Sequence, residues 1–138
     1  MSAYAAQVGG TTANLKENDT LTVNDLLHAM MLPSGNDAAS VLAENFGVYM
    51  YFQSKEFLLK YGNSEVITNL RITHPAKHFV QEMNDTAVKL GLQETYYGNA
   101  HGSDILICRI GLANKLGRSS AFDVAKLSFT AMKHPYFQ

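Results

Sequence analysis

Residues 21–44 read LTVNDLLHAMMLPSGNDAASVLAE, and they contain two helical patterns separated by a turn. The apolar residues of the first half recur at helical spacing, which predicts a helix with one buried face. They are Val23, Leu26, Leu27, Met30 and Met31. Thr22 and Asp25 stand three residues apart at its start, as in a capping box with Asp in place of Glu. Pro33 is expected to stop this helix.

The turn carries Ser34, Gly35 and Asn36, residue types that favour turns and helix caps. Either Asn36 or Asp37 is expected to cap a second helix, which the pattern carries as far as Gly47. The local prediction is therefore a helix, a tight turn and another helix.

Composition limits the function classes. The 138 residues fit one domain, and 46% hydrophobic with 17% charged residues are typical of a soluble globular protein. A net charge of −1 gives no electrostatic footprint for nucleic acid. The single cysteine, Cys108, cannot form an intrachain disulfide and is expected to be buried among apolar neighbours. No signal peptide or membrane span is predicted, so the chain as given is expected to be intracellular.

The middle of the chain is harder to read. Residues 48–52 fit a strand or a helix, whereas 57–59 and 66–67 favour further helix. A helix is expected to begin after Pro75 and to end at Gly91. Its apolar face should contain Phe79, Met83, Ala87 and Leu90.

A last helix is expected after a short apolar stretch of uncertain type at 103–116. Ser119 or Ser120 should cap it, with Ser120 and Asp123 in capping-box register, and Pro135 should end it. The predicted packed face comprises Ala121, Val124, Ala125, Leu127, Ser128 and Ala131.

Ser34-Gly35-Asn36 resembles the Ser-x-Asn element of the D-alanyl-D-alanine carboxypeptidases, the low-molecular-weight penicillin-binding proteins. Four further segments resemble parts of that family in the same order: 5–15, 79–92, 95–102 and 119–125. The resemblance implies a mainly α fold, the helical subdomain of the β-lactamase/DD-peptidase-like fold, with at most short strands. We expect a single domain, 1–138, with an insertion at about 47–78.

Two family motifs are missing. None of the nine serines has a lysine three residues later, and no Lys-Thr-Gly or Lys-Ser-Gly occurs. Two hypotheses therefore stay open. The first is a catalytically inactive carboxypeptidase-like domain that acts as a structural or interaction subunit of a larger assembly. The second is a fragment or split half of a serine-type D-Ala-D-Ala carboxypeptidase that acts on peptidoglycan peptides.

The resemblance implies roles for two site residues. Ser34 matches a serine that relays protons, and Asn36 matches an asparagine that holds the substrate backbone. Without a nucleophile, both could instead serve only the turn and the helix cap. His101 lies in the family-like loop and either lines the remaining cleft or bonds within its loop.

No cofactor and no metal are expected. His74 and His78 are four residues apart, but the strong zinc signature needs a glutamate directly after the first histidine, and Pro75 stands there.

Partners follow from the resemblance too. The sheet of the intact family fold lies outside this sequence, so we expect a protein partner to cover the face that packs on that sheet. The aromatic cluster Tyr49, Tyr51 and Phe52 fits either core packing or such an interface. No nucleic acid and no membrane span are expected. The compartment stays unassigned, although members of this family usually act in the cell envelope.

Overall fold

The computed structural model describes residues 1–54, 74–103 and 116–137. Helices account for the secondary structure of these residues, and a single antiparallel bridge joins Tyr96 and Arg118. The prediction of a mainly α fold is confirmed. The elements are α1 (Ala3–Ala6), α2 (Val23–Met31), α3 (Asn36–Gln53), α5 (Pro75–Lys89), α6 (Ala121–Ala131) and the 3-10 helix η2 (Pro135–Phe137).

The start of α2 is as predicted. The Thr22 hydroxyl accepts a hydrogen bond from the Asp25 amide at 3.1 Å, and the Asp25 carboxylate accepts one from the Thr22 amide at 3.3 Å. The predicted buried face is too wide, because Val23 is 51% and Met31 64% exposed. Only Leu26 is buried, since α2 packs mainly against α3.

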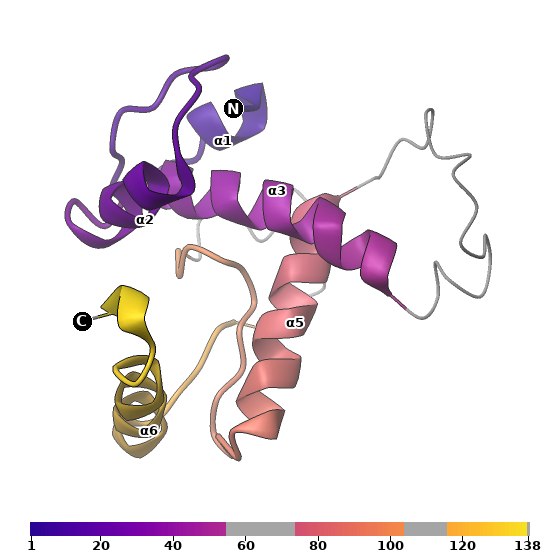
Figure 1. The fold of residues 1–138 in the computed structure, drawn as a ribbon, viewed down its shortest axis with the longest axis vertical. Coiled ribbons are helices and arrows are strands. Elements are labelled where there is room, and N and C mark those ends of the chain that lie inside the picture. The colour runs from indigo at the N-terminus through magenta and orange to yellow at the C-terminus, as the bar shows by residue number, and fades with distance from the viewer. Residues whose placement is uncertain (55–73, 104–115, 138) are drawn as a thin grey trace.

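Helix α3 is the centre of the fold and packs against α1, α2 and α5 (Figure 1). The core cluster of buried residues comprises Ala5, Leu26, Ala38, Val41 and Leu42. The predicted end of this helix at Gly47 is wrong, because the helix continues to Gln53. Gly47 is instead a contact point, since a Cβ there would collide with the carbonyl group of Pro75 at the start of α5. Residues 48–52 are consequently helical.

Helix α5 has the predicted boundaries. It begins at Pro75 and is followed by Gly91, whose φ of +66° is the left-handed conformation common after a helix. Ala87 is fully buried, whereas the other three residues of its predicted face, Phe79, Met83 and Leu90, are only half-buried.

Helix α6 is capped by Ser120 as predicted, but its predicted packed face is wrong. Ala121, Val124, Ala125 and Ser128 are exposed, Leu127 and Ala131 are half-buried, and only Asp123 is buried. The reason is that α6 makes no helix contact as extensive as those within α1, α2, α3 and α5. Figure 1 shows it standing apart from α5.

Some predictions fall outside the described residues: the helical patterns at 57–59 and 66–67, the apolar stretch with Cys108, and the middle of the predicted 47–78 insertion. The described ends of that insertion belong to α3 and α5. Among the helices described, none has the length and apolar character needed to cross a lipid bilayer.

Candidate functional site

Ser34 lies in the turn between α2 and α3. Its side chain is exposed, and its backbone has a left-handed φ of +57°. Gly35 follows with its amide bonded to the Ala29 carbonyl at 3.2 Å. An added Cβ on Gly35 would lie 2.6 Å from that same carbonyl oxygen, so only glycine fits there. The turn is therefore tightly fixed against the end of α2.

Asn36 is the first residue of α3 and is 8% exposed. Its side-chain amide donates a hydrogen bond to the Gly9 carbonyl at 2.8 Å, and its backbone amide donates one to Thr11 at 2.9 Å. Its carbonyl accepts the Ser40 hydroxyl at 2.8 Å. Asn36 thus ties α3 to residues 9–11, and one donor of its side chain is already used.

Asp37 is the strongest anchor of the site and is 1% exposed. Its carboxylate accepts hydrogen bonds from the Thr12 hydroxyl at 2.6 Å and from the backbone amides of Ala13, Leu15 and Ala38 at 3.0, 3.0 and 2.9 Å. Burial alone would raise the pKa of Asp37, but these bonds stabilise the charged form and hold the pKa below its ordinary value. The sequence indicated Asp37 only as a possible cap, because nothing in a local pattern reveals bonds to residues 22–25 positions earlier.

The family-like loop 95–102, with the following Ser103, is held to α5 by Asn84. The side-chain oxygen of Asn84 accepts the Tyr97 amide at 2.8 Å, and its nitrogen donates to the Tyr97 carbonyl at 2.9 Å. The far end of the loop reaches the turn. A Cβ built on Gly10 would lie 2.6 Å from the Asn36 side-chain nitrogen and 3.9 Å from the Ser103 hydroxyl. The structure thus brings Asn36 and this loop together around Gly10.

His101 is half-buried in that loop, and its Nδ1 accepts the Ser103 amide at 3.2 Å. A narrow hollow of about 30 Å³ separates it from Tyr4, Ser40 and Val80. Burial lowers the pKa of His101, which favours the neutral ring. The ring therefore bonds within its loop, which is one of the two predicted alternatives, and it also faces a small hollow against α3.

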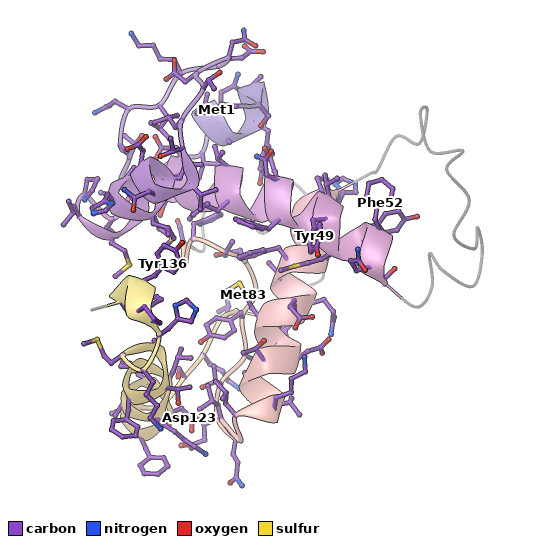
Figure 2. All side chains as sticks on the ribbon, in the orientation of Figure 1. Met1, Tyr49, Phe52, Met83, Asp123 and Tyr136 are labelled. Atoms are coloured by element: carbon purple, nitrogen blue, oxygen red, sulfur yellow. The ribbon has the colours of Figure 1, made fainter. Side chains whose placement is uncertain are left out.

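Asp123 fixes the other end of the loop (Figure 2). Its carboxylate accepts the Glu94 amide and the Thr95 hydroxyl, both at 2.8 Å. The predicted capping box is only half formed, because the Ser120 hydroxyl accepts the Asp123 amide while the Asp123 carboxylate turns to the loop. Burial, and secondarily the charge of Asp123, raises the pKa of Tyr97.

His74 and His78, the two histidines considered as metal ligands, have different surroundings. His74 is the exposed residue before α5, with a φ of +61°, and the His78 ring packs on Tyr51 at 4.7 Å between centroids. In the part of the chain that the structure describes, no three His, Cys, Asp or Glu side chains are grouped so that they could hold a metal ion.

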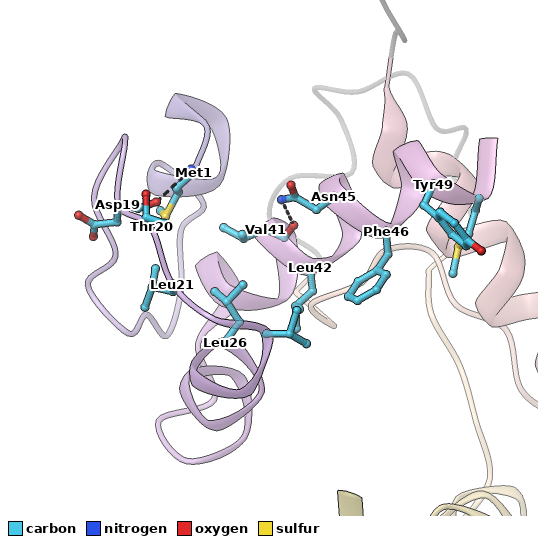
Figure 3. A pocket seen from close by; sticks show the side chains of 12 residues that line it. Met1, Asp19, Thr20, Leu21, Leu26, Val41, Leu42, Asn45, Phe46 and Tyr49 are labelled. Carbon is cyan, nitrogen blue, oxygen red and sulfur yellow. Dashed lines mark hydrogen bonds between the residues drawn. The ribbon is translucent and has the colours of Figure 1, made fainter. Parts of the chain in front are cut away.

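Two apolar hollows flank α3. The first, about 630 Å³, lies between residues 19–21, α2 and α3, and its wall includes Leu21, Leu42, Phe46 and Tyr49 (Figure 3). The second, about 320 Å³, lies between α3, α5, the loop and α6. Its lining is Met50, Phe79, Glu82, Met83, Thr86, Tyr97 and Leu127. Met50 lines both hollows, so they adjoin along α3.

The predicted aromatic cluster lies at the end of α3. Tyr49 is 64% exposed, whereas Tyr51 and Phe52 are half-buried, with their rings edge to face at 5.8 Å between centroids. Tyr51 and Phe52 thus pack against each other, whereas Tyr49 is exposed to solvent.

Comparison with known proteins gives a consistent result. No protein-family model matches the chain. It is 28% identical over 137 residues to a D-alanyl-D-alanine carboxypeptidase of Streptomyces sp. strain K15, a match that covers 99% of this chain and 37% of that protein. It is 30% identical over 121 residues to D-alanyl-D-alanine carboxypeptidase DacD of Escherichia coli, covering 88% of this chain and 22% of DacD.

Solved structures agree with these matches. The Streptomyces K15 DD-transpeptidase is 29% identical with a TM-score of 0.60, over 92% of this chain and 37% of that one. A D-alanyl-D-alanine carboxypeptidase of Mycobacterium tuberculosis, 22% identical, gives a TM-score of 0.64 over 99% of this chain and 39% of that one, which is a likeness of fold. The chain is therefore a part-length relative of the D-alanyl-D-alanine carboxypeptidases and penicillin-binding proteins, and it has the fold of their helical part.

Proposed function

We propose that this chain is a catalytically inactive carboxypeptidase-like domain that acts as an interaction subunit of a larger assembly. The observation that carries the proposal is the absence of any serine followed three residues later by lysine, together with the absence of Lys-Thr-Gly or Lys-Ser-Gly. Acyl transfer by a serine needs a base that takes its proton. Ser34 matches a relay position of the family, but the chain supplies nothing that matches the nucleophile.

The geometry of the Ser-x-Asn turn supports a structural role for it here. The side-chain nitrogen of Asn36, which matches the family's substrate-holding group, donates one of its two hydrogens to the Gly9 carbonyl. The neighbouring Asp37 holds residues 12–15 against the start of α3. These bonds organise the fold whether or not a substrate binds.

The apolar hollows beside α3 support the interaction role. Phe46 is 39% and Tyr49 64% exposed on α3, and Met50 lies between the two hollows. Apolar surface that is exposed and contiguous is a common feature of protein contacts. Because the chain matches only 22–39% of the lengths of the relatives described above, a polypeptide that supplies the rest of this fold is the proposed partner. The single domain 1–138 with an insertion at about 47–78 is part of this proposal.

A second function is favoured by the same partial coverage. The chain would be a fragment or split half of a serine-type D-Ala-D-Ala carboxypeptidase, with nucleophile, base and sheet supplied by other residues. In that case Ser34 and Asn36 would complete a site formed with the other part.

A fluorescent penicillin separates the two functions. The purified 138-residue chain should form no covalent adduct, because acylation needs an activated serine. A stoichiometric adduct that is lost in Ser34→Ala would overturn the proposal that the chain is catalytically inactive. An adduct that appears in the partner's presence and is weakened by Ser34→Ala would favour the split enzyme.

A further inference from the structure

The outer side of α6 carries aromatic and cationic side chains in one row. Phe122, Lys126 and Phe129 follow at spacings of four and three, which places them on one face of α6. Lys133 lies two residues beyond the end of the helix, and its ammonium is 4.4 Å from the centre of the Phe129 ring. Phe122 is 75% and Phe129 68% exposed, and both lysines are exposed. We call these four residues the α6 row.

The two phenyl rings of the α6 row lie on another side of α6 than its attachment to the fold. Asp123, 3% exposed, holds the helix to Glu94 and Thr95, and Leu127 lines the second hollow. A helical step of about 100° per residue sets Asp123 and Leu127 roughly 100–160° away from Phe122 and Phe129. A partner seated in the second hollow would therefore leave the two phenyl rings uncovered.

Further exposed groups stand before and after the row in the sequence. Tyr136 is 81% and Phe137 52% exposed in η2, directly after α6, and Figure 2 shows Tyr136 at that end of the helix. Arg118 is exposed just before α6. Within residues 116–137 the only acidic side chain is Asp123, which is buried. The exposed formal charges of this segment are consequently all positive.

The lysines of the α6 row indicate whether the row suits a protein interface or a lipid surface. Their ammonium groups are held only lightly: Lys126 donates to the Gly91 carbonyl at 3.3 Å, and Lys133 lies 4.4 Å from the centre of the Phe129 ring. Lysine is depleted in protein–protein interfaces, where its ammonium would have to lose its water. At a lipid surface, the aliphatic stem can lie beside the phenyl rings while the ammonium reaches the headgroup phosphates.

We propose that the α6 row is a peripheral binding site for an anionic lipid surface. The phenyl rings of Phe122 and Phe129 enter the boundary between headgroups and acyl chains. Lys126, Lys133 and Arg118 bind the phosphate groups around them. Each cation near such a surface adds roughly 1 kcal/mol, so loss of two lysines should weaken binding by about tenfold or more.

Flotation with lipid vesicles tests the proposal on the full 138-residue chain. The chain should float with vesicles of equal parts phosphatidylcholine and phosphatidylglycerol but not with phosphatidylcholine alone, and added salt should release it. Lys126→Glu with Lys133→Glu should reduce binding by about tenfold or more. Phe129→Ala should also reduce it, because the phenyl ring is lost from the boundary.

Matched control variants test whether a loss of binding comes from the α6 row or from a change in net charge or exposed apolar surface anywhere on the chain. Lys16→Glu with Lys77→Glu makes the same change in net charge at exposed sites outside the row, and Leu32→Ala removes an exposed apolar side chain elsewhere. Both should bind vesicles like the unchanged chain, and circular dichroism should show all variants folded. The proposal is overturned if the anionic vesicles do not bind, or if the row and control variants lose binding equally. It is also overturned if the row binds an immobilised acidic peptide and no vesicle.

Discussion

The hydroxyl of Thr12 donates a hydrogen bond of 2.6 Å to the carboxylate of Asp37, 25 positions later in the chain. This bond joins the segment before α2 to the start of α3, on either side of the Ser34 turn. The position of the turn therefore depends on a carboxylate that the sequence indicated only as a possible helix cap.

Replacing Asp37 should lower stability at neutral pH. Asp37→Asn removes the charge that four donors surround, and hydrogen bonds to charged groups are each worth about 1.5–3 kcal/mol. We expect a loss of about 2–3 kcal/mol in the free energy of unfolding, measured in urea by circular dichroism. Asp85→Asn, at an exposed site bonded to Gln81, is the matched control and should cost less than about 0.5 kcal/mol. Equal losses in the two variants would contradict the anchoring role.

The same carboxylate predicts a dependence on pH. The pKa of Asp37 is lower in the folded chain than in the unfolded chain, so its stabilisation is complete above the unfolded value of about 4. It is lost as pH falls through the folded value. Urea unfolding of the unchanged chain and of Asp37→Asn should therefore differ most at neutral pH and converge in acid. A difference that grows with acidity would refute this assignment.

Gly10 should be sensitive to a single methyl group. Gly10→Ala places a Cβ 2.6 Å from the Asn36 side-chain nitrogen at a φ of +87°. Gly102 has a similar φ of +75° with nothing within 4 Å of its Cβ, so Gly102→Ala measures the backbone strain alone, about 1–2 kcal/mol. Gly10→Ala should cost more and should shift the side-chain amide resonance of Asn36. Identical costs and an unmoved resonance would mean that Asn36 gives way freely.

Alanine substitution should lower the stability of the fold less at Ser34 than at Leu26 of α2. Leu26→Ala empties a core position that is 7% exposed and should cost about 2–5 kcal/mol, whereas the half-buried Leu27 should cost less. Ser34→Ala, in an exposed turn, should cost at most about 1 kcal/mol. Thermal unfolding of the three variants decides the order, and a Ser34→Ala loss above that of Leu26→Ala would reveal a buried role for the hydroxyl.

The hollows beside α3 should make the isolated chain associate or bind a hydrophobic dye. Light scattering should show a mass above the 15.2 kDa monomer, or the dye should report exposed apolar surface. Tyr49→Ser, in the first hollow, should weaken this behaviour. Val88→Ser, at a residue 77% exposed that lines neither hollow, should not. A monomer that does not raise the fluorescence of the dye would contradict the proposal that a partner covers the hollows beside α3.

Local patterns predicted the fold well wherever a helix end is set by its own residues. The Thr22–Asp25 box, the Pro75 start and the Gly91 end of α5 are all decided within one helical turn. The prediction failed at Gly47, where a glycine that resembles a helix end serves a contact with another helix.

The site was predictable only in part. The resemblance indicated Asn36 and the loop 95–102 as separate family-like segments, and the structure brings Asn36 and Ser103, the residue after that loop, close to Gly10. Asp37, Asn84 and Asp123 were missed as anchors because their partners lie between 13 and 29 positions away. The packed face of α6 failed for a different reason: periodicity identifies an apolar side but not whether another element covers it.

The close approach of Gly47 to Pro75 has a consequence for how this chain can change. The crossing of α3 and α5 is set at that point by backbone against backbone. Any side chain larger than hydrogen at position 47 would therefore separate the two helices, so the crossing of α3 and α5 tolerates change least where it has no side chain at all.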